Sequence, residues 1–249
     1  MKKIKNDEIK EFVKKSYAKV ATSGCSCCSD PSLLLSGIET AALTGYSHEE
    51  LKDLPAQVKE MFAGCGNPVA LSELKVGETV LDIGSGGGLD AFLAAKKVGT
   101  TGGVVGIDFT REMIRKAMRN AKGLGLKNVE FRLGDAEDMP VETRSIDVVI
   151  SNCVINLAPD KGKVFKEAYR VLKPGGRMII SDIVTEGRLP EEIRRDPRYW
   201  AGCVAGALEI EDYLRKMRRA GFRHVKVLSR ANFTKTILSI IVKAQKPED

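Results

Sequence analysis

The sequence predicts an α/β fold in which a mostly parallel sheet carries helices on both faces. Two observations lead to this prediction. From about residue 73 to residue 185, short apolar runs alternate with longer helical stretches, an order typical of repeated β–α units. After residue 220, two more segments alternate apolar and polar residues, as half-buried strands do. The length of 249 residues suits one large domain with additions.

The alternating region predicts each element in turn. Strands are expected over 78–84, 102–108, 128–135, 145–152 and 177–184, and helices over 89–99, 111–125 and from 161 to a point before Pro174. Gly99 ends the first helix, and the proline ends the third because its ring cannot continue a helix. A helix over 210–222, with Gly221 at its end, precedes two closing strands at 224–230 and 235–246.

Two segments flank this region, so we divide the chain into residues 1–70, 71–184 and 185–249. The first is a helical, cysteine-rich extension, in which Ser47 and Glu50 have the spacing of a capping box and His48 falls in a first helical turn. The last begins with a helical insertion at 189–208 that glycines interrupt, and His224 starts a closing strand. The middle segment holds the ligand-binding motifs.

Composition limits the classes of function. The net charge of +7 is spread over short groups and only 6% of residues are aromatic, so nucleic-acid binding is not expected. The sequence has no run of about 20 apolar residues, which is the length needed to span a membrane. The charged start of the chain lacks the apolar core of a signal peptide, which predicts a cytoplasmic protein with reduced thiols.

A glycine loop follows the first predicted strand and opens a helix. Gly84, Gly86 and Gly88 let the backbone approach a ligand closely, although any tight turn favours glycine. Asp108 ends the second strand and could hold ribose hydroxyls, while Asp135 ends the third and could accept an adenine amine. Asp82 precedes the loop and suits a cationic ligand. Helix capping by these acids and a nicotinamide enzyme are the alternatives.

Cysteines are the other unusual feature. Cys153 stands where the fourth strand ends, and Cys65 and Cys203 lie in glycine-flanked segments outside the sheet. Three thiols around one centre would bind a soft, thiophilic atom. Burial as inert apolar side chains is the simpler alternative. Cys25 and Cys28 have the C-x₂-C spacing of a zinc site, but the chain has no second pair.

The glycine loop "VLDIGSGGG" (80–88), "VVGID" (104–108), "LGDAEDMP" (133–140) and "VLKPGG" (171–176) together resemble motifs of the S-adenosylmethionine-dependent methyltransferases. The resemblance implies a Rossmann-like sheet, mostly parallel, whose last strand runs antiparallel. It places the glycine loop against the methionine part of the donor, Asp108 against the ribose and Phe109 near the adenine. The expected donor-binding residues are Asp82, Gly84, Ser85, Gly86, Asp108, Phe109, Asp135, Ala136 and Asn152.

The segments "AGCGNP" (63–68), "SNCVINLAPDK" (151–161) and "YWAGCVAGAL" (199–208) resemble those that carry the cysteines of arsenite methyltransferases. The resemblance implies methyl transfer to trivalent arsenic bound by Cys65, Cys153 and Cys203. That family often has a further N-terminal cysteine, for which this chain offers Cys25, Cys27 and Cys28. These thiols could capture arsenic or form a disulfide that a reductant of the glutathione or thioredoxin type reopens.

We therefore expect an enzyme that methylates arsenite or its thiol complexes in detoxification. Trivalent arsenic keeps a lone pair that can attack the methyl group directly, so no general base is needed, and neither histidine is a convincing one. A methyltransferase for a small organic substrate and a thiol protein that binds metalloids without turnover are the alternatives. The sequence leaves the oligomeric state open, and a monomer is consistent with it.

Overall fold

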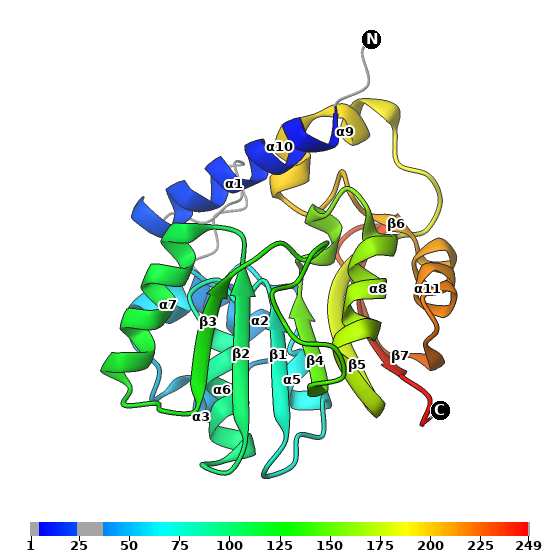
Figure 1. Ribbon diagram of the computed structural model, residues 1–249. Helices are drawn as coiled ribbons and strands as arrows, with labels where there is room; N and C mark the ends of the chain where they lie inside the picture. The colour runs from blue at the N-terminus through cyan, green and yellow to red at the C-terminus, as the bar shows by residue number, and fades with distance from the viewer. Residues whose placement is uncertain (1–4, 24–36, 249) are drawn as a thin grey trace.

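A computed structural model of the chain describes residues 5–23 and 37–248. It has three layers, with one eight-stranded sheet between two layers of helices (Figure 1). The strand order is β3-β2-β1-β4-β5-β8-β7, and β6 pairs with β5 outside this path. In the described part of the chain, no helix has both the length and the apolar character needed to cross a membrane.

Five parallel strands form the central part of the sheet. They are β1 (Thr79–Ile83), β2 (Gly103–Asp108), β3 (Val129–Leu133), β4 (Ile146–Asn152) and β5 (Leu172–Thr185). β1 lies between β2 and β4, with Ile83 opposite both Ile107 and Ser151. The carboxyl ends of these strands therefore meet at one edge, where open α/β sheets bind ligands. The five predicted strands are confirmed, although β3 ends two residues before Asp135.

Helices cover both faces, as the sequence predicts. α6 (Leu89–Val98) and α7 (Arg111–Gly123) pack on one face, where the rings of Phe92 and Phe131 meet edge to face at 5.8 Å. α8 (Lys161–Val171) and α11 (Ile210–Arg219) pack on the other, where Phe165 and Tyr213 meet at 5.3 Å. These contacts join residues far apart in the chain and fix the helices against the sheet.

The chain closes with β7 (Arg223–Asn232) and β8 (Ile237–Gln245). β8 inserts between β5 and β7 and is antiparallel to both, which confirms the expected antiparallel last strand. Strand β6 (Leu208–Glu209) was not predicted, because two residues are too few to show a pattern. It pairs with β5 at the end of the insertion and directs the chain into α11.

The flanking segments supply further helices, of which all but α1 are short. They are α1 (Asn6–Ser23), α2 (Gly37–Leu43), α3 (His48–Leu51), α4 (Ala56–Glu60), α5 (Pro68–Leu71), α9 (Glu191–Arg195) and α10 (Pro197–Ala201). The predicted capping box is present at α3, where the Ser47 side chain accepts from the Glu50 amide and the Glu50 side chain accepts from the Ser47 amide. α1 contacts α7 and α10 and lies across the carboxyl edge of the sheet (Figure 1).

Candidate active site

A cleft of about 720 Å³ opens at the carboxyl edge of the parallel strands, beneath α1. Its walls include most of the donor-binding residues expected from the sequence, namely Asp82, Gly84, Ser85, Gly86, Asp108, Phe109 and Asn152. Cys153 also lines it, at the position directly after β4. Because these residues come from β1, β2, β4 and the glycine loop, the parallel sheet itself brings them together.

The glycine loop has a conformation that other residues adopt only with strain. Gly84 and Gly86 have φ angles of +72° and +51°. A methyl group on Gly84 would lie 2.2 Å from Cγ2 of Val154, whereas one on Gly86 would have no atom within 4 Å and would project into open space. The amides of Gly84 and Ser85 donate to the Ile107 carbonyl, which ties the loop to β2. The loop thus leaves room for a ligand above Gly86.

Two buried carboxylates flank this loop. Asp108 accepts from the amides of Gly86 (3.1 Å) and Thr110 (2.8 Å), and burial raises its pKa. Asp82 is 2% exposed, and burial, followed by the charges of Asp90 and Asp108, raises its pKa well above the usual range. Its Oδ2 and the Ser85 hydroxyl have no hydrogen-bond partner among the described residues. Buried polar atoms without partners are costly, so a bound ligand with a cationic group would satisfy them.

Asp135 and Ala136 do not line this cleft. Asp135 accepts a hydrogen bond from Lys10 of α1 at 2.7 Å, and the same ammonium group contacts Glu137 at 2.9 Å. Ala136 packs against the apolar core beneath α8. The sequence placed Asp135 at the end of a strand. The structure instead places it in the turn after β3, where the N-terminal helix neutralises its charge.

The three expected thiols lie in one cluster. Cys65, Cys153 and Cys203 are 7%, 6% and 4% exposed and share an apolar environment that includes Leu157 and Ile183. The thiols of Cys203 and Cys65 contact that of Cys153, and these contacts, with burial, raise the pKa of Cys153 well above its usual range. The Cys153 thiol is therefore protonated at neutral pH, and the cluster borders the cleft through this residue.

The backbone at two of these positions is strained. Cys153 and Cys203 have φ angles of +61° and +62°, in the left-handed region that residues other than glycine seldom adopt. Such conformations cost about 1–3 kcal/mol each and concentrate at functional sites. The Cys203 thiol donates to the carbonyl of Cys153 at 2.9 Å. Among residues 5–23 and 37–248, no group of three or more Cys, His, Asp or Glu side chains has an arrangement that could hold a metal ion.

Asn152 lines the cleft, but its side chain also forms hydrogen bonds with other parts of the protein. Its Oδ1 accepts from the Cys65 amide at 2.9 Å, and its Nδ2 donates to the Gly66 carbonyl at 2.7 Å and to Asp90 at 3.1 Å. Tyr46 donates to the other oxygen of Asp90 at 2.5 Å. Asn152 therefore fixes the Cys65 loop beside Cys153.

Sequence reasoning missed Tyr46 and Asp90, because nothing in their local sequence shows that they meet. The only signal was at Asp90, which stands within the apolar stretch "LDAFLAA" (89–95), where burial of the carboxyl would require a polar partner. Burial raises the pKa of Asp90 to about 6, while the hydrogen bonds from Tyr46 and Asn152 oppose this rise. The expected N-terminal thiols Cys25, Cys27 and Cys28 lie outside the described residues.

Comparison with known proteins identifies the family. A family described as "Methyltransferase domain" matches residues 74–221. The arsenite methyltransferase of Halobacterium salinarum is 44% identical over 93% of this chain, and that of Homo sapiens is 34% identical over 84%. The chain covers 61% and 55% of these two relatives, so it spans somewhat more than half of their length.

A solved structure agrees with this relationship. The crystal structure of an arsenic(III) S-adenosylmethionine methyltransferase from Chlamydomonas reinhardtii matches with a TM-score of 0.69 and 37% identity. The match covers 80% of this chain and 73% of that one. The chain therefore belongs to the methyltransferase domain family, and within it to the arsenite methyltransferases.

Proposed function

We propose that the protein transfers a methyl group from S-adenosylmethionine to trivalent arsenic held by Cys65, Cys153 and Cys203. One observation carries the proposal: Cys153 belongs both to the thiol cluster and to the wall of the glycine-loop cleft. An arsenic atom bound to this thiol would face a donor bound in the cleft. Alignment of the two reactants would supply most of the rate enhancement.

The cleft has groups suited to each part of the donor, which supplies an electrophilic methyl group on a sulfonium. Asp108 can accept from ribose hydroxyls while it keeps its bonds from the Gly86 and Thr110 amides. The unpartnered Oδ2 of Asp82 can accept from the donor's ammonium group. Phe109 provides an apolar wall for the adenine. Asp135 and Ala136 lie outside this set, and the proposal gives them no contact with the donor.

The thiols suit arsenic because they are soft ligands and because their protons need no separate acceptor. When a thiol replaces a hydroxide on arsenite, the proton leaves with that hydroxide as water. The raised pKa of Cys153 is thus no obstacle. Rotation of the Cys203 thiol away from the Cys153 carbonyl would complete the set. Residues 1–70 and 185–249 then serve as additions that bring Cys65 and Cys203 to the domain formed by residues 71–184.

Transfer makes the arsenic formally pentavalent, and its return to the trivalent state needs two electrons. A pair of thiols supplies them by forming a disulfide, which a reductant of the glutathione or thioredoxin type reopens. Cys25, Cys27 and Cys28 are proposed to take part in this step or in arsenic capture. The need for reduced thiols favours the cytoplasm as the place of action.

The test is incubation with arsenite, a thiol reductant and S-adenosylmethionine, followed by chromatographic separation and quantification of arsenic species. Methylated arsenicals are expected from the native chain and not from Cys153→Ser, since a hard hydroxyl replaces a soft thiolate. Calorimetry with the donor is the control and should give equal affinities for both proteins. Methylation by Cys153→Ser at the native rate would contradict the proposal.

A further inference from the structure

The donor cleft holds three buried carboxyl groups and no cation to balance them. Asp82, Asp90 and Asp108 come from β1, α6 and β2, all line the cleft, and each is at most 9% exposed. We call these residues the carboxyl cluster. Within the described parts of the chain, no lysine, arginine or histidine lines the cleft, and no cation forms an ion pair with the cluster. Buried charges of one sign are costly, so these groups do not all lose their protons at neutral pH.

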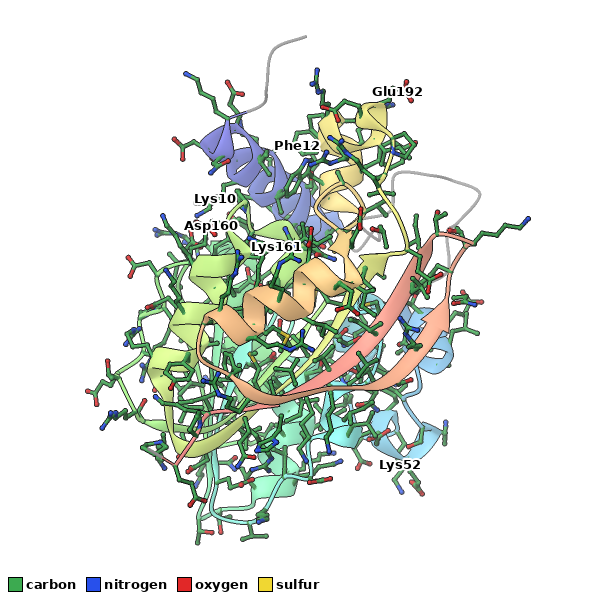
Figure 2. The ribbon with its side chains drawn as sticks, turned by 90° about the vertical axis from the view of Figure 1, so that its right-hand side faces the viewer. Lys10, Phe12, Lys52, Asp160, Lys161 and Glu192 are labelled. Atoms are coloured by element: carbon green, nitrogen blue, oxygen red, sulfur yellow. The ribbon has the colours of Figure 1, made fainter. Side chains whose placement is uncertain are left out.

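Two lysines of the N-terminal helices pair with other acids. Lys10 of α1 donates to Asp135 and Glu137, and Lys52, which follows α3, forms an ion pair with Glu49. Figure 2 shows Lys10 beside α1 and Lys52 at the outer edge of the molecule. The positive charge that the carboxyl cluster lacks must therefore come from a proton or from a ligand.

Hydrogen bonds distinguish the three carboxyls. Asp108 accepts from two backbone amides, which stabilise its ionised form. Asp90 accepts from Tyr46 and Asn152, yet burial still raises its pKa to about 6. The Oδ2 atom of Asp82 has no partner among the described residues, and burial raises the pKa of Asp82 well above its usual range. The Asp82–Asp90 pair therefore shares a proton at neutral pH.

Other titratable groups also face the pair or the cleft. Tyr46 is buried, and burial with the charges of the pair raises its pKa well above the usual range. Contacts with the other thiols, together with burial, raise the pKa of Cys153 in the same direction. Glu50 of α3 carries a negative charge, which raises the pKa of Asp90 further, and Tyr17 of α1 lines the cleft. Release of a proton near neutral pH is therefore assigned to the carboxyl pair.

We infer that the Asp82–Asp90 pair exchanges its proton for the positive charge of the donor, and that it thereby distinguishes S-adenosylmethionine from the demethylated product. The inference rests on the proposed function, which supplies the donor. S-adenosylmethionine carries an ammonium and a sulfonium group, whereas S-adenosylhomocysteine keeps the ammonium but has a neutral thioether. An additional cation favours ionised carboxylates. Donor binding should therefore release more protons than product binding.

This exchange would favour turnover. When the methyl group leaves, the sulfur keeps the electron pair of the broken bond and loses its positive charge. The carboxyl pair then takes a proton from solvent, which restores the charge balance of the cleft and weakens its attraction for the product's ammonium group. Asp90 is thus a specificity-determining residue that responds to the charge of the ligand.

The test is calorimetry in the absence of arsenite, so that neither ligand is consumed. Titrations at about pH 6 in two buffers of different ionisation enthalpy give the number of protons that each ligand releases. For the native protein, S-adenosylmethionine should release up to about one proton more than S-adenosylhomocysteine, which matches the difference in their charge. Asp90→Asn removes one of the two shared carboxyls and should lower this difference by roughly half or more. Asp53→Asn, which removes an exposed carboxyl paired with Lys96, is the matched control and should keep the native difference.

Affinities give a second readout on the native protein. Between about pH 5.5 and 6.5 the amino groups of both ligands stay protonated, and the ratio of donor to product affinity should rise by up to about tenfold. Tyr46→Phe removes a hydrogen bond that favours ionised Asp90 and should shift this rise to higher pH. Equal proton release by the two ligands in the native protein, or an undiminished difference in Asp90→Asn, would overturn the inference. Failure of S-adenosylmethionine to bind would instead refute the donor assignment of the proposed function.

Discussion

Two neighbouring glycines of the cleft should respond to the same substitution in different ways. Gly84→Ala would place a methyl group 2.2 Å from Val154, the residue after Cys153, at a φ of +72°. The left-handed backbone costs about 1–2 kcal/mol and the overpacking about 1–3 kcal/mol, which gives a total of roughly 2–5 kcal/mol. Gly86→Ala has no such clash, so only the backbone cost of about 1–2 kcal/mol applies.

The assay combines thermal unfolding with calorimetry of donor binding. One kcal/mol shifts the melting temperature by about 2–4 °C in a chain of this size, so Gly84→Ala should melt roughly 4–20 °C below the native protein. Gly86→Ala should lose only about 2–8 °C. It should nevertheless weaken S-adenosylmethionine binding, because its methyl group projects into the cleft. Native donor affinity in a folded Gly86→Ala protein would refute the assignment of the glycine loop to the donor.

Four further outcomes are expected. Asp108→Ala should weaken donor binding by about 1.5–3 kcal/mol, the value of hydrogen bonds to a charged group, and calorimetry should show little change in arsenite binding. Tyr46→Phe removes the bond to Asp90, so urea unfolding at pH 8 should show a loss of about 1.5–3 kcal/mol, and an unchanged midpoint would contradict the network. Because burial raises the pKa of Asp90 from 3.8 to about 6, folding takes up protons in this range and the contribution of Asp90 to stability falls as pH rises from about 4 to 6. Unfolding free energies of the native protein and of Asp90→Asn, measured across this range, should therefore differ in slope, and parallel curves would show that Asp90 does not titrate there. Replacement of Cys25, Cys27 and Cys28 by serine should preserve methylation of thiol-complexed arsenic but slow turnover on free arsenite. The rates on both substrates are measured over a range of glutathione concentrations, and complete loss of both activities would show that the cluster holds an obligatory ligand.

Local pattern predicted the parallel strands and the helices between them, because each is long enough for its periodicity to show. The carboxyl ends of β1, β2 and β4 also follow from the pattern, and so does the position of Cys153 directly after β4. The pairing of the closing strands does not follow from the local pattern. Alternation marks β7 and β8 as strands, but the insertion of β8 next to β5 depends on contacts between distant segments.

The site shows the same division between local and distant information. The glycine loop and Asp108 are encoded within about 25 residues and lie together in the cleft. Asp135 was expected to face the donor, yet Lys10 pairs with it from the N-terminal helix, 125 positions away. Asn152 was assigned to the donor, although its amide group mainly holds the Cys65 loop. Polar partners that arise from tertiary packing leave no local signature.

The positive φ angles of Cys153 and Cys203 were also outside the reach of sequence reasoning. Cysteine has no preference for the left-handed region, so its presence there follows from the packing around it. The resemblance to arsenite methyltransferases predicted that these two thiols and Cys65 share one site. In the structure the three thiols lie in one apolar cluster, but the Cys203 thiol donates a hydrogen bond to the Cys153 carbonyl.

Arsenic K-edge X-ray absorption on the arsenite-loaded protein tests most directly whether the thiol cluster is the arsenic site. With small thiols removed after loading, the account predicts that the first shell of arsenic contains three sulfur atoms in a variant whose Cys25, Cys27 and Cys28 are serine. It predicts that the further change Cys153→Ser replaces one of these sulfurs by oxygen or releases the arsenic. An identical sulfur shell with and without the Cys153 thiol would contradict the placement of arsenic beside the donor cleft.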